Sequence, residues 1–163
     1  MLFSVSVVDA LRTFGVLAEL KWPNDIVLNR KKVGGILIET GIRGENISHA
    51  LMGLGLNLYR QEFEETPNAG SVEGLTGIHV PLDLFLDQME MTYNANKVHL
   101  KDWEALYPLY FSKLIGRTPE KFVDANGEFT GHIVEVEPSG HVLIQKESGE
   151  KLRFDFKEIQ FVY

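Results

Sequence analysis

The alternation of apolar and polar residues predicts one helix and four strands within the first 58 residues. Helical spacing relates four apolar residues near the start, Phe3, Val7, Leu11 and Phe14. Gly15 follows them, where a left-handed C-terminal cap fits. Four apolar runs with short polar connections are then expected to form strands at residues 20–22, 26–28, 33–40 and 47–58. These strands would make up most of one antiparallel or mixed sheet.

The middle of the chain predicts a long loop and two further helices. Between residues 59 and 80 the pattern gives way to acidic residues, proline and glycine, with one short helix expected near residues 72–75. Pro81 suits the first turn of a helix, and apolar residues keep helical spacing after it. Asp102 is a candidate N-cap for another helix, in which Pro108 should cause a kink or an early end.

The last 50 residues have a different period. Alternating, β-like runs lie at residues 121–123, 128–136, 141–146 and 151–156, with Asn-Gly and Ser-Gly turn signals between them. This spacing predicts a small β-barrel. The predicted fold class is α+β, with a mostly antiparallel or mixed sheet that carries helices on one face, followed by the barrel. We expect one domain at residues 1–114 and a second at residues 115–163.

Composition limits the classes of function. The chain has 163 residues, 44% hydrophobic and 24% charged, as in an ordinary globular protein. Its formal net charge of −7 argues against general affinity for nucleic acid or for an anionic membrane. The absence of cysteine excludes disulfides, thiolate zinc sites and a cysteine nucleophile. Asp9 and Arg12 interrupt the apolar opening, which predicts neither a signal peptide nor a membrane span and favours a cytoplasmic protein.

Site chemistry concentrates in two short stretches between apolar runs. They read Lys21-Trp22-Pro23-Asn24-Asp25 and Lys32-Val33-Gly34-Gly35-Ile36-Leu37-Ile38-Glu39. Pro23 has no amide hydrogen and biases Trp22 toward extended geometry, so the first stretch predicts a strand that runs into an irregular corner. Residues 26–39 then indicate a β-hairpin with a polar tip at residues 29–31 and Lys32 at the start of its second strand.

These stretches resemble the signature of biotin protein ligases. The family pattern is lysine-tryptophan-proline-asparagine-aspartate, then lysine-x-glycine-glycine-isoleucine-leucine-x-glutamate, and every position matches. Gly53-Leu54-Gly55-Leu56-Asn57-Leu58 is similar to the family's glycine-rich strand that ends in an asparagine at the nucleotide site. The resemblance implies a biotin-acetyl-CoA-carboxylase ligase, which converts biotin and ATP into biotinyl-AMP and transfers biotin to a lysine of a biotin carboxyl carrier protein. It also implies that Mg²⁺ arrives with ATP and that the barrel is Src-homology-like.

The resemblance assigns roles to particular residues. Lys32 is the expected catalytic residue, a compact positive charge between the biotin carboxylate and the α-phosphate. The expected biotin and adenylate-binding residues are Lys21, Trp22, Asn24, Asp25, Lys32, Gly34, Gly35 and Asn57. Asp25 is expected to help hold magnesium or to orient a lysine.

Each role has a structural alternative. A lone lysine after a polar turn is usually solvated, and Lys21 with Asp25 could form an ordinary surface ion pair. Asn57 could cap a turn, and an aromatic residue at a strand end, such as Trp22, is more often part of the core. A dinucleotide-binding loop at residues 53–58 is unsupported, because position 58 is leucine and no helical pattern follows.

Family members also carry a glycine/arginine-rich loop upstream of the tryptophan motif, and the twenty residues before Lys21 contain no glycine-arginine repeat. We therefore expect the chain to match the later part of the family's catalytic core plus its C-terminal domain. Its catalytic site is expected to be incomplete. A non-catalytic binding module is the alternative, and its exposed sheet edges would favour a homodimer. A further alternative is acyl transfer of the kind that lipoate ligases carry out. The tryptophan motif argues against it.

Overall fold

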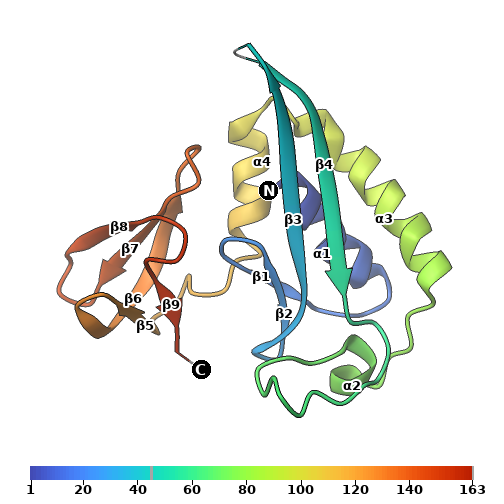
Figure 1. The fold of residues 1–163 in the computed structure, drawn as a ribbon, viewed down its shortest axis with the longest axis horizontal. Helices are drawn as coiled ribbons and strands as arrows, with labels where there is room; N and C mark the ends of the chain where they lie inside the picture. Colours follow the sequence, from blue (N-terminus) through green and yellow to red (C-terminus); the bar gives the residue numbers. More distant parts are fainter. Residues whose placement is uncertain (45, 163) are drawn as a thin grey trace.

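The computed structural model describes residues 1–44 and 46–162 and contains two antiparallel sheets (Figure 1). The first sheet has the strand order β1-β2-β3-β4. Its strands are β1 (Glu19–Lys21), β2 (Asp25–Leu28), β3 (Lys31–Arg43) and β4 (Asn46–Leu56). The four strands predicted from the sequence are all present, and the α+β fold class is confirmed.

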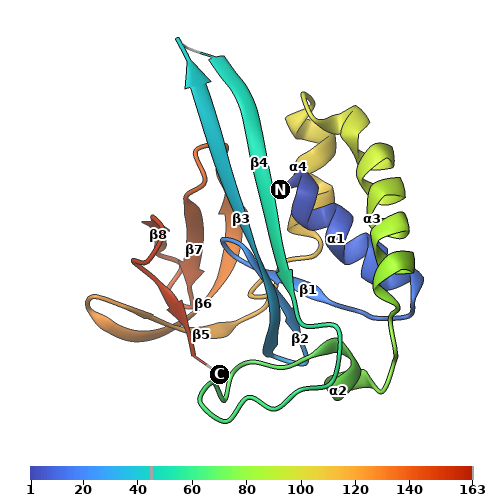
Figure 2. The same ribbon diagram turned by 45° about the vertical axis from the view of Figure 1, so that its right-hand side comes forward.

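Helices cover one face of the first sheet, as expected (Figure 2). They are α1 (Leu2–Thr13), α3 (Leu82–Asn96) and α4 (Trp103–Phe111), and a 3-10 turn, η1 (Lys97–His99), follows α3. The predicted cap positions are confirmed, since Gly15 has a φ of +82° and the Asp102 carboxylate accepts a hydrogen bond from the Ala105 amide at 3.0 Å. Pro108 lies inside α4, which ends three residues later.

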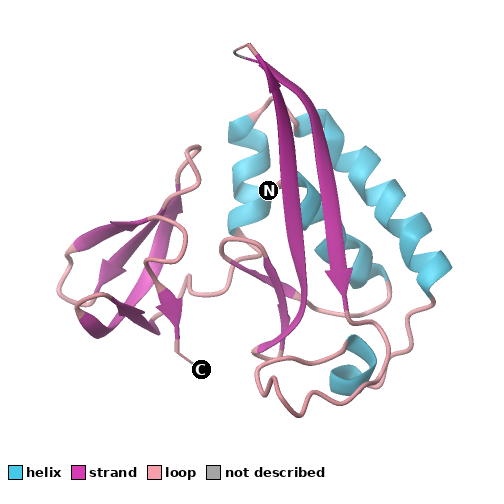
Figure 3. Ribbon diagram, in the orientation of Figure 1, coloured by secondary structure: helices cyan, strands magenta, loops and turns pink. Residues whose placement is uncertain are grey.

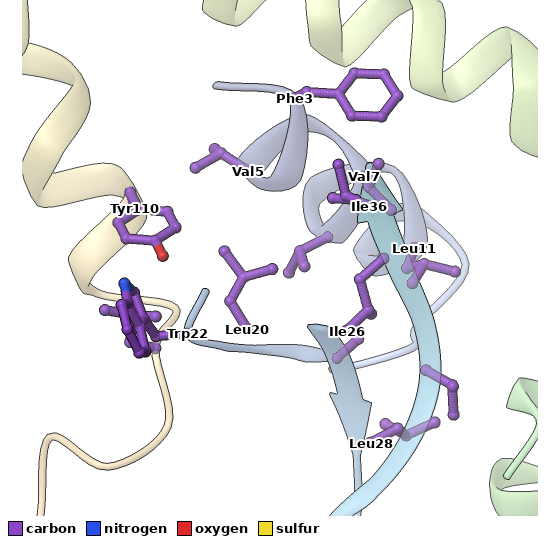
Figure 4. Packing of buried hydrophobic residues seen from close by; sticks show 14 of the residues in the cluster. Phe3, Val5, Val7, Leu11, Leu20, Trp22, Ile26, Leu28, Ile36 and Tyr110 are labelled. Carbon is purple, nitrogen blue, oxygen red and sulfur yellow. The ribbon is translucent and has the colours of Figure 1, made fainter. Parts of the chain in front are cut away.

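Helix α1 is buried on more sides than the single apolar stripe in its sequence predicts. Nine of its 12 residues are buried, because the helix is packed between the sheet and its neighbours α3 and α4. Two of the buried residues are serines, and each hydroxyl donates to a backbone carbonyl of the preceding turn, Ser4 to the N-cap residue Met1 and Ser6 to Leu2. Figure 4 shows the resulting core, in which α1 side chains meet Leu20 and Ile26 of the sheet.

The β2–β3 hairpin has a tight tip and a register shift. Asn29 and Arg30 have φ values of 49° and 65°, the conformation of a two-residue type I′ turn, so that Lys31 already belongs to β3. Ile26 is paired with Gly34 whereas Val27 is paired with Lys32, which leaves Val33 as an extra residue. Such bulges redirect side chains locally, and this one lies inside the motif.

Beyond the hairpin, β3 and β4 form a long two-stranded extension, and β4 ends before Asn57. The predicted loop at residues 59–80 is present and includes the short helix α2 (Val72–Thr76), whose N-cap Ser71 accepts a hydrogen bond from the Gly74 amide. Figures 1 and 3 show the β3–β4 extension projecting away from the rest of the chain. Its exposed side chains include Leu37, Ile42 and Leu51.

The second sheet has the order β8-β7-β6-β5-β9. Its strands are β5 (Glu120–Asp124), β6 (Gly127–Val136), β7 (Val142–Lys146), β8 (Lys151–Phe154) and β9 (Gln160–Phe161). Phe122, Phe129 and Phe161 pack together inside it. Among residues 1–44 and 46–162, the strand pairing joins neighbours from β8 through to β9, and no pairing joins β8 to β9. The two-residue strand β9 was not predicted.

The predicted division after residue 114 falls between α4 and β5 and stays a prediction; Tyr163, the last residue of the predicted barrel, lies outside the described residues. Side chains connect the first sheet and α4 to the second sheet. Arg30 forms two hydrogen bonds of 2.7 Å with the Glu120 carboxylate, and the Tyr107 hydroxyl accepts one from the Val136 amide at 3.2 Å. Among the described helices, none is both long and apolar enough to cross a membrane.

Candidate active site

A pocket of about 760 Å³ lies between the two sheets and brings most of the predicted site residues together. From the first sheet it is lined by Val27, Lys32 and residues 21–25, which we call the first wall. Thr66, Asn68 and Ala69 contribute from the loop before α2. The opposite side, which we call the second wall, consists of Phe156, Lys157, Ile159, Gln160 and Phe161.

Lys32 and Asp25 form an ion pair in this pocket. The distance from Lys32 Nζ to Asp25 Oδ1 is 2.5 Å, and the Lys32 side chain is 52% exposed. The backbone of Lys32 is held on its other edge by the loop, because its amide donates to the Asn68 carbonyl at 2.7 Å and its carbonyl accepts from Gly70 at 2.9 Å. A pair this exposed adds little stability, so its consequence is a positioned positive charge facing the pocket.

Lys21 adds a second positive charge beside this pair. Burial lowers the pKa of Lys21, the carboxylate of Asp25 raises it, and the charge of Lys32 lowers it again. The Lys21 ammonium also lies 5.4 Å from the ring centroid of Phe161 on the second wall, within the range of a cation–π contact. The predicted grouping of both lysines with Asp25 is therefore present in the fold.

The two glycines of the motif differ in what surrounds them. A Cβ atom on Gly34 would lie 2.6 Å from the Gly55 carbonyl oxygen, so a side chain there would push β3 away from β4. A Cβ atom on Gly35 would be in ordinary contact, 3.5 Å from Lys32 Nζ and 3.7 Å from Asp25 Oδ1. Gly34 is thus required by strand packing, whereas a Cβ atom at position 35 would fit in ordinary contact with the ion pair.

The two asparagines use their amide groups on the backbone. Asn24 Nδ2 donates to the Ile36 carbonyl at 2.6 Å, and the Ile36 amide donates back to the Asn24 carbonyl at 2.9 Å. Asn57 Nδ2 donates to the Gly70 carbonyl at 3.0 Å, which connects the end of β4 to the loop before α2. These bonds favour the structural alternative for Asn57, and contact of either asparagine with a nucleotide stays a prediction.

Trp22 connects the first sheet to the second. Its side chain is only 6% exposed, and Figure 4 shows it next to Tyr110 of α4. Its indole Nε1 donates to the Gly140 carbonyl at 3.0 Å, in the turn between β6 and β7. The adjoining Trp22–Pro23 peptide bond is cis. Trp22 therefore lines the pocket as part of the core, as the structural alternative expects, and its contact with a ligand stays a prediction.

Among the described residues that line this pocket, Asp25 is the one with an acidic side chain that could contact a metal ion. Within residues 1–44 and 46–162, no three histidine or acidic side chains gather into a group that could hold a metal ion by protein ligands alone. Mg²⁺ commonly binds through one or two carboxylates together with substrate phosphates. A single carboxylate in the pocket is compatible with Mg²⁺ that is also bound by substrate phosphates. It is too few for a Mg²⁺ site built from protein ligands alone.

The second wall was not identified by the sequence. Its residues belong to the turn after β8 and to β9, and no motif marks them as site residues. The aromatic and cationic content of residues 154–161 was a weak signal, since the same types occur in ordinary β-structure. The packing of the second sheet against the first places these residues at the pocket.

Comparison with known proteins agrees with this arrangement. Residues 1–57 match the model of the Biotin/lipoate A/B protein ligase family. A biotin-acetyl-CoA-carboxylase ligase of Paracoccus denitrificans is 28% identical over 82% of this chain, and a bifunctional ligase/repressor BirA of Bacillus spizizenii is 26% identical over 93%. The chain spans 59% and 49% of the lengths of these two curated relatives.

Solved structures show the same fold. The biotin protein ligase of Aquifex aeolicus in its apo form has a TM-score of 0.73 and 24% identity, with 99% of this chain and 72% of that chain covered. The same enzyme in complex with biotin and ATP also has a TM-score of 0.73 and 24% identity, with coverage of 99% and 69%.

The family model matches the part of the first sheet that carries both motifs, residues 1–57, which is about a third of the chain. Over 99% of its length, the chain is similar in fold to a biotin protein ligase. The resemblance predicted from the tryptophan and glycine motifs is confirmed.

Proposed function

We propose that this chain acts as a biotin-protein ligase. In the first step, a biotin carboxylate oxygen attacks the α-phosphorus of ATP, the bond to the β-phosphate oxygen breaks, and pyrophosphate leaves. In the second step, a lysine amine of a biotin carboxyl carrier protein attacks the carbonyl of biotinyl-AMP, and AMP leaves as the amide forms. The observation that carries this proposal is the convergence of Lys21, Asp25 and Lys32 on one pocket.

The charges of this group suit the first step. Two anionic reactants must approach each other, and a fixed ammonium lowers the cost of bringing them together. In the proposed site Lys32 lies between the carboxylate and the α-phosphate, Lys21 adds charge near the phosphates, and Gly35 leaves room beside Lys32. The absence of a side chain at Gly35, directly beside Lys32 Nζ, and the half-exposed Lys32 side chain support these roles.

We infer that Mg²⁺ accompanies ATP and that Asp25 is the residue that would hold it, together with phosphate oxygens. When bound, the ion would neutralise part of the phosphate charge. We further infer a cytoplasmic enzyme whose macromolecular partner is the carrier protein rather than nucleic acid or membrane, consistent with the net charge of −7.

The test is formation of biotinyl-AMP, measured by mass spectrometry with the purified chain, biotin and magnesium-ATP. We expect adenylate from the native chain and about a 10²–10³-fold lower rate from Lys32→Ala, the loss typical when one group that stabilises transition-state charge is removed. Lys101→Ala, at an exposed lysine outside the pocket, is the matched control and should keep the native rate. Equal rates for Lys32→Ala and the native chain would contradict the role of Lys32.

Two alternatives are decided by the same assay. Lipoate in place of biotin tests the other acid named by the family, and preferential lipoyl-AMP formation would replace biotin as the substrate. The exposed apolar residues of the β3–β4 extension favour the second alternative, a non-catalytic interaction module that forms a homodimer. A folded, dimeric chain that makes no adenylate would support that module and overturn the ligase proposal for this polypeptide.

A further inference from the structure

Lys157 lines the pocket from the second wall, opposite Lys32. It lies in the turn between β8 and β9, and its side chain is exposed. Its Nζ lies 5.3 Å from the ring centroid of Phe156, which lines the same pocket. No motif drew attention to this lysine, and the function proposed above gives it no role.

The backbone of Lys157 has a conformation that local folding does not favour for lysine. Its φ is +73°, in the left-handed region that glycine adopts without steric cost and that other residues enter rarely. The hydrogen bonds of the turn come from its neighbours: the Asp155 amide donates to the Glu158 carboxylate at 2.7 Å, and the Phe156 amide donates to the Asp155 carboxylate at 2.6 Å. Strained residues of this kind occur preferentially at ligand sites.

The charges that line the pocket are unlike those of the chain as a whole. The charged lining residues are Lys21, Asp25, Lys32 and Lys157, three cations and one anion, in a chain whose net charge is −7. A concave surface with an excess of one sign concentrates the electrostatic potential inside it. The ligand that this pocket favours is therefore a compact polyanion, and Lys157 supplies one of its three positive charges.

We propose that Lys157 is a further binding residue, which contacts the outer phosphates of a nucleoside triphosphate and the pyrophosphate it releases. This inference rests on the proposed function and extends it to the second sheet. Lys32 acts at the phosphorus where bonds change, whereas Lys157 acts on the leaving group from the opposite wall. The strained lysine is then explained by its charge, since glycine would suit the turn better.

The experiment measures the binding of magnesium-ATP, pyrophosphate and AMP to the full chain by isothermal titration calorimetry. Lys157→Gly removes the charge and relieves the backbone, while Lys157→Arg keeps the charge. We expect Lys157→Gly to weaken ATP and pyrophosphate binding about three- to tenfold and AMP binding less than about twofold, with the differences shrinking in high salt. The thermal midpoint should stay unchanged or rise by about 2–4 °C. Lys157→Arg should restore affinity.

Two control variants separate the effects. Lys101→Asn removes an exposed positive charge outside the pocket, and Asn29→Gly relieves a positive φ of 49° away from it. Both should bind ATP like the native chain. If the native chain binds ATP and Lys157→Gly binds it equally well, the inference about Lys157 is overturned and the ligase proposal stands. A native chain that binds no ATP overturns the ligase proposal itself. A lower midpoint, with equal losses for ATP and AMP, would make Lys157 a structural residue and also overturn the inference.

Discussion

The two walls of the pocket differ in how they are held. On the first wall, Lys32 lies in a strand whose backbone is bonded on both edges, to β2 and to the loop before α2. The second wall lies in a turn and a two-residue strand with mostly exposed side chains. Its placement depends on side-chain contacts between the sheets, including Trp22 with Gly140 and Arg30 with Glu120. The position of Lys32 is therefore fixed by local backbone bonds, whereas the width of the pocket is set by contacts elsewhere.

The largest effect should come from the two glycines of β3 next to the first wall, Gly34 and Gly35. Gly34→Ala would place a Cβ atom 2.6 Å from the Gly55 carbonyl oxygen, and because this oxygen belongs to the backbone of β4, the strands must separate. We expect a loss of about 1–3 kcal/mol in the free energy of unfolding. Gly35→Ala is the matched control, since its Cβ meets only ordinary contacts.

Chemical denaturation and adenylate formation together distinguish the two glycines. Gly35→Ala should retain native stability within about 0.5 kcal/mol but lose adenylate formation, because its methyl group occupies the space beside Lys32. Equal stability of both variants would mean that the β3–β4 spacing tolerates a side chain at position 34. Native activity in Gly35→Ala would mean that substrate does not approach Lys32 from this side.

The next effect concerns the connection between the walls. Trp22→Phe keeps an aromatic ring in the core but removes the indole donor to the Gly140 carbonyl and leaves a smaller side chain. We expect the free energy of unfolding to fall by about 1–2 kcal/mol, measured by urea denaturation. The Michaelis constant for ATP should rise more than the rate constant falls, because the second wall is displaced while Lys32 keeps its own backbone bonds.

Trp103→Phe is the matched control for this variant. Trp103 is 37% exposed and stacks on Tyr107 at a centroid distance of 5.2 Å, outside the residues that line the pocket. Its replacement should cost less than about 1 kcal/mol and leave the Michaelis constant for ATP unchanged. A larger loss from Trp103→Phe than from Trp22→Phe would show that α4, rather than the indole bond, holds the second sheet in place.

The same contrast explains what the sequence could and could not predict. The first wall is contiguous in the chain, so Lys21, Asp25 and Lys32 could be grouped from a motif and a hairpin pattern. The bulge at Val33 and the side-chain hydrogen bonds of Asn24 depend on pairing across strands, which spacing along the chain does not reveal. The second wall depends on sheet-to-sheet packing. Strand β9 was not predicted either, because a strand of two residues is too short to show an alternating apolar and polar pattern.

The smallest effect should arise in the turn that holds Gly140. Glu137 accepts hydrogen bonds of 2.9 Å from Arg153 and from the Ser139 hydroxyl, and Arg153 and then Ser139 hold the pKa of Glu137 below its ordinary value of 4.5. Because the folded chain favours the ionised form, the resulting stabilisation is complete above about pH 4.5 and is lost as pH falls through the lower pKa of the folded state.

Glu137→Gln should therefore lower the thermal midpoint by about 1–3 °C at pH 7, and this difference should shrink as the pH falls through the lowered folded-state pKa of Glu137, because the protonated carboxyl resembles the amide. Glu62→Gln, at an exposed loop glutamate, should leave the midpoint unchanged over the same pH range. In a Trp103→Phe background, Trp22 fluorescence reports whether the Gly140 contact loosens. If the thermal midpoints of the native chain and Glu137→Gln differ by the same amount at every pH, the carboxylate charge does not stabilise this turn. The second wall is then positioned by the other contacts between the sheets.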